Sequence, residues 1–171
     1  MNGTSEKVRT IRREVYCNMR ICILNSIIEE IEETCKGSTR EQGFILGCSK
    51  RYGYVDMCQS IQGSATEYEY IPDIDYTNAV IDEWRRRGIC FCGMIHSHLT
   101  LKTLSPGDYA AVQSWTKSAA LPFLIFGVIV DGSESANIRV YISSTQKGEV
   151  RVQELRRIRP MIPSQWVKWG H

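Results

Sequence analysis

Two of the three histidines in this 171-residue sequence are two residues apart, in the segment GMIHSHLTLKTLSPGD. Alternate residues of a β-strand share one face, so His96 and His98 would present both imidazoles to the same side. Neutral imidazole is a preferred zinc ligand, and a carboxylate is a usual third ligand. Asp108 would reach the same ion if the loop after His98 folds back. The spacing therefore predicts a three-ligand zinc site whose fourth position is left for water, as in catalytic zinc centres.

A catalytic zinc site also needs a base that takes a proton from the attacking water. Glu41 is the candidate, because it directly precedes the apolar segment QGFILG, which we expect to be a strand of the core sheet. A carboxylate within reach of the water can carry its proton to the leaving amine. Ser105 would then supply a hydroxyl group that stabilises the tetrahedral oxyanion.

The same residues also have an ordinary structural explanation. Ser105 followed three residues later by Asp108 resembles a capping box, with Pro106 at the first helical position. His96 and His98 could simply be residues at the end of a strand, and Glu41 could be a surface acid at the entrance of another. The residue pattern by itself leaves both interpretations open.

The elements that must position these residues follow from hydrophobic periodicity. Helical spacing of apolar residues predicts helices over 18–35 and 75–87, and the capping signal predicts a third helix over 105–119. Apolar or alternating runs predict strands over 40–49, 53–60, 67–73, 89–97, 121–130, 136–143 and 149–156. This order predicts an α/β or α+β layered domain.

Composition limits the class of protein. The length fits one domain, and 43% hydrophobic with 23% charged residues argues against disorder. The net charge of +2 is too small to indicate nucleic-acid binding, and we interpret the arginine runs at 85–87 and 156–159 as solvated faces. No apolar stretch approaches the roughly 18 residues of a membrane span, and the N-terminus lacks the apolar region of a signal peptide. We therefore expect a cytoplasmic protein with no membrane or nucleic-acid partner.

The seven cysteines are best explained as buried thiols in a reducing compartment. Their number is odd, and no C-x-x-C pair occurs. Cys90 and Cys92 form a C-x-C pair that would share one face of a strand. We interpret this pair as core packing rather than as part of a zinc site, because no second pair is present to complete four ligands.

Taken together, these residues resemble the JAMM metalloproteases, also called MPN+ or JAB proteins, which are zinc-dependent isopeptidases of the deubiquitinase type. The family pattern is a glutamate ahead of a glycine-rich apolar strand, then H-[ST]-H-P, a short spacer and S-x-x-D. The matching segments are EQGFILG with Glu41, GMIHSHL with His96 and His98, and SPGD with Ser105 and Asp108. The segment IDEWRRRG leads into the histidine strand as in the family, and the resemblance runs from about residue 15 to 145.

The resemblance implies both a fold and a set of roles. The fold would be an MPN/JAB-like (cytidine-deaminase-like) mixed β-sheet flanked by helices, in a single domain over 1–171 with an unassigned tail at 156–171. Zn²⁺ would be bound by His96, His98 and Asp108. Glu41 would be the general acid/base, and Ser105 the oxyanion-stabilising residue.

The sequence departs from the family pattern at two points between the second histidine and the serine. Leu99 occupies the position of the usual proline, so the fixed φ that proline would impose on the backbone is absent. The spacer LTLKTL has six residues, one fewer than in the family pattern. A shorter spacer changes how Asp108 reaches the metal, but neither departure removes a ligand.

The resemblance also implies a substrate. Compact single-domain chains of this kind are similar to stand-alone bacterial JAMM proteins, which accompany ubiquitin-like conjugation systems, including antiphage operons. We therefore expect hydrolysis of the amide bond after the C-terminus of a ubiquitin-like modifier, in deconjugation or precursor processing. The modifier's tail would lie along a strand edge, flanked by the segment from about 63 to 75 with Tyr68 and Tyr70. A JAMM-type hydrolase of another peptide or amide and a non-catalytic MPN scaffold stay as alternatives.

Overall fold

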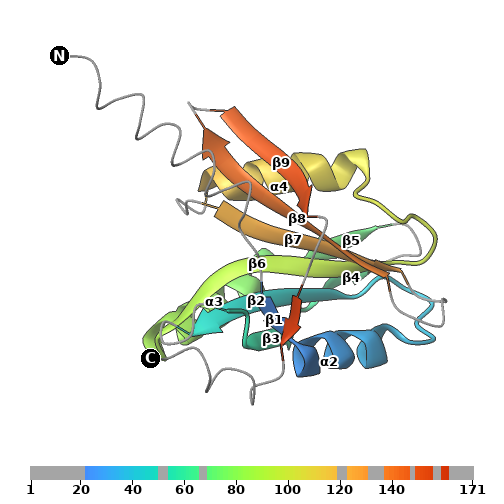
Figure 1. The fold of residues 1–171 in the computed structure, drawn as a ribbon, viewed down its shortest axis with the longest axis horizontal. Coiled ribbons are helices and arrows are strands. Elements are labelled where there is room, and N and C mark those ends of the chain that lie inside the picture. The colour runs from blue at the N-terminus through green and yellow to red at the C-terminus, as the bar shows by residue number, and fades with distance from the viewer. Residues whose placement is uncertain are drawn as a thin grey trace.

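The computed structural model describes residues 22–49, 54–65, 69–118, 123–130, 137–146, 149–155 and 159–161. Within them, the chain forms a mixed six-stranded sheet in the order β3-β2-β6-β7-β8-β9, with two short pairs, β1-β10 and β4-β5, beside it (Figure 1). The strands are β1 (Cys22–Leu24), β2 (Gly43–Ser49), β3 (Met57–Ser60), β4 (Gly63–Ala65), β5 (Tyr70–Pro72), β6 (Ile89–His98), β7 (Phe123–Val130), β8 (Asn137–Gln146), β9 (Glu149–Leu155) and β10 (Arg159–Met161). The helices are α2 (Asn25–Cys35), α3 (Ile74–Arg86) and α4 (Pro106–Ser118).

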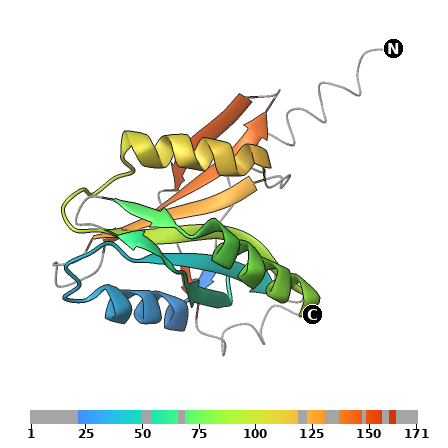
Figure 2. The same cartoon turned by 180° about the vertical axis from the view of Figure 1, so that it is seen from behind.

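Helices cover both faces of the central sheet. On one face, which we call the α2 face, Ile27 and Ile31 of α2 are buried against Phe44 of β2. On the opposite face, the α3/α4 face, Trp84 of α3 and Val112 of α4 are buried in a second apolar cluster. Figure 2 shows α3 and α4 in front of the sheet, together with the β4-β5 hairpin. The chain is therefore a layered α+β domain, as the order of predicted elements indicated.

The predicted helices over 75–87 and 105–119 are confirmed, and each has the expected end signals. Asp73 caps α3, because its side chain accepts a hydrogen bond from the Tyr76 amide at 2.9 Å. Gly88 follows that helix with φ of +76°, the left-handed conformation typical of a glycine that ends a helix. Within the described residues, no helix is long and apolar enough to cross a membrane.

The predicted helix over 18–35 is wrong at its start. Residues 22–24 form β1, which pairs in parallel with β10, and helix α2 begins only at Asn25. The amide of Leu24 donates to the carbonyl of Val55, so tertiary pairing uses a main-chain group that a helix would have used. Strands β4 and β10 were not predicted, because three-residue strands such as Gly63–Ala65 have no hydrophobic alternation. Residues 1–21 and most of the tail after 155 lie outside the described residues.

The strand that carries the histidines contains a β-bulge. Met94 of β6 pairs with Ile45 of β2, and Phe91 pairs with Gly47, so β6 has one residue more than β2 between these two pairs. The additional residue is Cys92, next to Gly93. A bulge of this kind bends the strand and changes the direction of the side chains that follow it.

The bulge determines which face the histidines occupy. Before it, Phe91 belongs to the α3/α4 face, where its ring lies 6.1 Å from that of Trp115. After it, Met94 belongs to that same face, so the alternation has shifted by one residue. Because of this shift, His96 and His98 lie on the α3/α4 face, which is also the face that α4 covers with Asp108. Regular alternation through the same residues would instead place Phe91 and the two histidines on opposite faces of the sheet.

We predict that Gly93→Ala destabilises the protein strongly. A Cβ at this position would lie 1.8 Å from the carbonyl oxygen of Ile125 in the neighbouring strand β7. Because pairing fixes the backbones of both β6 and β7, neither strand can move away from the added Cβ. We therefore expect the free energy of unfolding to fall by about 3 kcal/mol, the upper end of overpacking effects. Urea denaturation monitored by circular dichroism measures this change.

Gly107→Ala is the matched control for that experiment. Its added Cβ would meet only the Ser105 hydroxyl, at 3.6 Å, which is an ordinary contact. Alanine also favours a helix over glycine by about 1 kcal/mol. Equal stability of the two variants would contradict the role assigned to Gly93.

Candidate metal centre

The end of β6 and the start of α4 bring two imidazoles and a carboxylate together. The Nε2 atoms of His96 and His98 lie 2.8 Å apart. The two carboxylate oxygens of Asp108 lie 3.1 Å from His96 Nε2 and 3.3 Å from His98 Nε2. The three predicted ligands therefore converge on one point.

These separations fit a tetrahedral zinc centre. With zinc–ligand distances of about 2.0–2.1 Å, two ligand atoms in a tetrahedral sphere lie about 3.3 Å apart. The two Nε2 atoms are 2.8 Å apart, and each lies within 3.1–3.3 Å of a different oxygen of the Asp108 carboxylate, so all these separations are near that value. Two nitrogens and one carboxylate also match the donor types that zinc binds. The donor types and their spacing therefore suit a metal ion such as zinc.

The loop after β6 fixes the tautomer of His98. Its Nδ1 lies 3.0 Å from the carbonyl oxygen of Leu101, which accepts and cannot donate, so Nδ1 carries the proton. In the neutral imidazole, Nε2 is then unprotonated and available to a metal. Hydrogen bonding of the second ring nitrogen to a carbonyl is the usual way in which proteins orient a ligating histidine.

A reciprocal capping box positions Asp108. The Ser105 amide donates to the Asp108 carboxylate at 2.6 Å, and the Asp108 amide donates to the Ser105 hydroxyl oxygen at 3.1 Å. This arrangement confirms the capping pattern predicted from the sequence. The structural and metal-binding interpretations are therefore compatible, because Asp108 contacts both the helix start and the two imidazoles.

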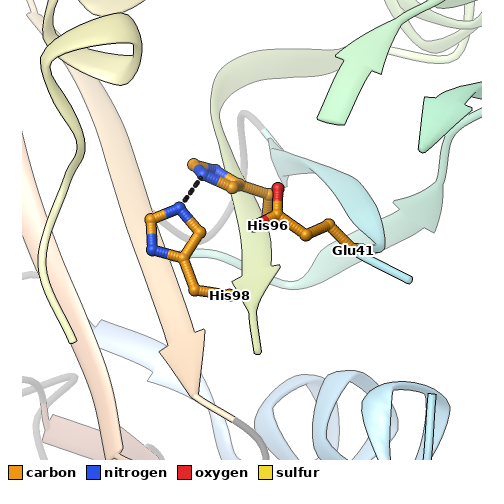
Figure 3. Close-up of side chains that lie close together, drawn as sticks. All are labelled: Glu41, His96 and His98. Carbon is orange, nitrogen blue, oxygen red and sulfur yellow. Dashed lines mark hydrogen bonds between the residues drawn. The ribbon is translucent and has the colours of Figure 1, made fainter. Parts of the chain in front are cut away.

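Glu41 is a second carboxylate close to the two histidines. One of its carboxylate oxygens and the two imidazoles form a group whose ligand atoms all lie within 4.8 Å of one another. Figure 3 shows the Glu41 side chain extending from the start of β2 toward His96. This group omits Asp108, so either carboxylate could complete a ligand set with the histidines. We assign Asp108 as the ligand because it is in direct contact with both Nε2 atoms.

Ser97, between the two histidines, holds Glu41 in place. Its hydroxyl oxygen accepts a hydrogen bond from the Gln42 amide at 2.8 Å, and its own amide donates to the Gln42 carbonyl at 2.8 Å. These bonds extend the pairing of β2 with β6 by one residue beyond Gly43. They fix the backbone next to Glu41 relative to the histidine strand. The side chain of Ser97 is buried on the α2 face, and no pattern in the sequence indicated this role.

The β4-β5 hairpin covers the start of β2 beside Glu41. The ring of Tyr70 lies where a Cβ on Gly43 would be, at 2.1 Å, so glycine is required there. The Tyr70 hydroxyl donates to the carbonyl of Ile61 at 2.7 Å. This packing places the hairpin next to the candidate metal centre, within the segment predicted to flank a substrate groove; Tyr68 lies outside the described residues.

Burial and mutual charge shift the pKa values of the site residues. Burial raises the pKa of Glu41 above its ordinary value, although the two neighbouring histidines oppose that shift. Burial alone would raise the pKa of Asp108, but hydrogen bonds from His96 and His98 hold it far below its usual range. Burial disfavours the charged form of His98, yet the contact with Asp108 outweighs this and raises its pKa. Asp108 is thus an anion, as a metal ligand must be.

The predicted cysteine pair is not a metal site in the described part of the chain. No cysteine there joins a group of three metal-binding side chains within 4.8 Å. Cys92 packs against the core, as expected, and burial raises its pKa. Cys90 is exposed, so the expectation that both thiols pack in the core is wrong for Cys90.

The candidate site lies apart from a cavity between α3 and α4. That cavity has a volume of about 600 Å³ and lies over the first residues of β6. Its lining includes Ile74, Phe91 and Trp115, and none of the candidate site residues contributes to it.

Comparison with known proteins supports the fold and leaves function open. No protein-family model matches the chain, and no curated protein matches it. The structure is similar to the solution structure of protein DSY2949 from Desulfitobacterium hafniense, with a TM-score of 0.59 over 84% of this chain and 96% of that chain. The sequence identity is 15%, so this similarity concerns the fold alone.

We predict that the purified protein binds one zinc ion per chain and that His98→Ala and Asp108→Ala lose it. Each substitution removes one of three convergent ligands, and two remaining ligands bind zinc weakly. Metal content after dialysis, measured by mass spectrometry, checks this outcome. Asp82→Ala is the control, because Asp82 only pairs with Arg85 on the surface of α3. Full zinc occupancy in both ligand variants would refute the ligand set.

Proposed function

We propose that this protein is a zinc-dependent peptidase of the JAMM type, with an MPN/JAB-like fold. The observation that carries the proposal is the convergence of His96, His98 and Asp108, with the Glu41 carboxylate within 4.8 Å of both imidazoles. An open three-ligand centre beside a buried carboxylate suits hydrolysis of an amide bond. A purely structural centre would have four protein ligands and no such neighbouring base.

A bound zinc ion would supply Lewis-acid polarisation of the scissile carbonyl and a lowered pKa for the attacking water. Glu41 takes the proton of that water as its oxygen adds to the carbonyl carbon. Glu41 then gives the proton to the leaving nitrogen as the C–N bond breaks, which yields a carboxylic acid and an amine. The capping bond leaves the hydroxyl proton of Ser105 free to donate to the oxyanion, because its oxygen acts there as the acceptor.

The substrate we propose is the C-terminal tail of a ubiquitin-like modifier, joined to a target or present as a precursor. An extended tail fits a site that is bounded by the β4-β5 hairpin, since a strand edge can pair with a peptide main chain. Gly63 and Ser64 of β4 are exposed, which leaves that strand accessible. The resemblance to stand-alone bacterial JAMM proteins supports a place in a ubiquitin-like antiphage pathway in the cytoplasm.

The function is tested with fusions of ubiquitin and of bacterial ubiquitin-like proteins to a fluorescent reporter at their C-termini. We expect the zinc-loaded protein to cleave at least one fusion after the terminal glycine of the modifier, and a chelator to abolish cleavage. If no fusion is cleaved while short peptides are, the substrate proposal fails but the peptidase proposal stands. If neither is cleaved by the zinc-loaded protein, the proposed function is wrong.

Glu41→Gln should abolish turnover while zinc binding is retained. The amide keeps the size of the side chain but cannot accept a proton, and general-base catalysis contributes about 10²–10⁴-fold to the rate. The rate of fusion cleavage and the zinc content are measured on the same preparation. Retained cleavage would show that another group is the base, and lost zinc would show that Glu41 is a ligand.

Ser105→Ala should have two separable effects. Loss of the capping hydroxyl should lower the free energy of unfolding by about 1 kcal/mol. Loss of the oxyanion donor should lower kcat by about 10²-fold. Ser105→Asp is the discriminating control, since aspartate caps a helix but as an anion cannot donate to the oxyanion. A Ser105→Asp variant with full activity would leave the residue with a structural role only.

A further inference from the structure

Four large apolar side chains are exposed among the described residues: Ile71, Ile74, Leu101 and Tyr109. Leu101 and Tyr109, which are 44% and 41% exposed, lie beside the proposed ligands. The Leu101 carbonyl is hydrogen-bonded to His98, and Tyr109 directly follows Asp108. Single exposed apolar residues are common on protein surfaces, but two next to one candidate centre need an explanation.

The backbone fixes both residues close to the metal centre. Leu101 lies on the six-residue loop between His98 and Ser105, and its carbonyl cannot leave the His98 imidazole without breaking their 3.0 Å bond. The Tyr109 amide donates to the Ser105 carbonyl at 3.1 Å, so Tyr109 lies in the first turn of α4. The neighbouring loop residues Thr100, Lys102 and Thr103 are exposed too but polar. Leu101 and Tyr109 are thus the large exposed apolar side chains on the described loop and first turn of α4.

This surface and the β4-β5 hairpin belong to different elements around the candidate centre. The hairpin packs on the start of β2, next to Glu41, whereas Leu101 and Tyr109 belong to the loop and helix that supply Asp108. An acyl chain that pairs with the hairpin reaches the reacting carbon near the histidines. The group on the far side of the scissile bond then passes over the loop and the start of α4.

We propose that Leu101 and Tyr109 determine specificity on the leaving-group side, where they bind an amine component with an apolar chain next to its nitrogen. This inference rests on the proposed function. An apolar first residue of a linear fusion satisfies this chemistry, and so does the aliphatic stem of an isopeptide-linked lysine. Burial of apolar surface against the two side chains favours such amines over polar ones.

The test uses the modifier that the zinc-loaded protein cleaves, in three substrates: a fusion whose reporter begins with Leu, one whose reporter begins with Ser, and a conjugate to a lysine side chain of a peptide. We expect kcat/KM for the Leu fusion to exceed that for the Ser fusion about ten-fold, in line with the discrimination that an apolar contact gives. Leu101→Ser and Tyr109→Ser should lower kcat/KM for the Leu fusion or for the lysine conjugate to the value of the Ser fusion. The readout is the ratio of kcat/KM for the Leu fusion to that for the Ser fusion, compared at equal zinc content, because the Leu101 carbonyl also bonds to His98.

Ile74→Ser is the matched control, since Ile74 is 50% exposed but lines the cavity between α3 and α4. It should leave all three rates unchanged. If the Leu101 and Tyr109 variants lose kcat/KM for the Leu fusion, the bound group is an apolar residue after the scissile bond. If they lose it for the lysine conjugate, the bound group is the lysine stem. Equal effects on all three substrates, or none, would overturn this inference while cleavage itself upholds the proposed function. If the wild-type protein cleaves no modifier substrate, this inference and the substrate proposal fail together, and cleavage of short peptides decides the peptidase proposal separately.

Discussion

The candidate metal centre lies on a strand, β6, whose two ends use the same face of the sheet only because a β-bulge interrupts the alternation. Because Cys92 adds a residue opposite β2, the alternation along the strand shifts by one, and both histidines leave the sheet on the face that α4 covers. Gly93 makes this possible, since a side chain there would collide with the carbonyl of Ile125 in β7. The bulge is thus the constraint that lets Phe91 pack at the start of β6 while the imidazoles at its end lie on the side of Asp108.

A second constraint is the shared use of Asp108. Its carboxylate accepts from the Ser105 amide and contacts both imidazoles, so helix start and metal centre are fixed by one side chain. The Leu101 carbonyl adds to this by fixing the tautomer of His98. The loop has six residues and no proline, and the structure shows that it still delivers the carboxylate to both histidines. Hydrogen bonds at its two ends replace the rigidity that a proline would give.

The sequence predicted much of the candidate site because its signals are local. The spacing of His96 and His98 on a strand and the pairing of Ser105 with Asp108 depend only on strand alternation and helix capping. The type of fold and the helices α3 and α4 could also be predicted, since their periodicity and end signals are strong.

Other features could not be predicted, because they arise from tertiary contacts. Strand β1 replaces residues 22–24 of a predicted helix when Leu24 bonds to Val55, and nothing in the local pattern indicates that partner. The bulge at Cys92 cannot be predicted from the alternation of residue types along β6, because it is defined by the pairing with β2. The role of Ser97 depends on Gln42, fifty-five positions earlier in the chain. Each of these features requires knowledge of which segments lie side by side.

Diffraction at the zinc absorption edge, from crystals grown with zinc, tests the central claim most directly. One anomalous peak is predicted, bounded by Nε2 of His96, Nε2 of His98 and the Asp108 carboxylate, with Glu41 near it but outside its ligand sphere. A peak ligated by Glu41 in place of Asp108 would contradict the assigned roles. A peak at the cysteines of β2 and β6, or no peak at the histidines, would contradict the metal centre itself.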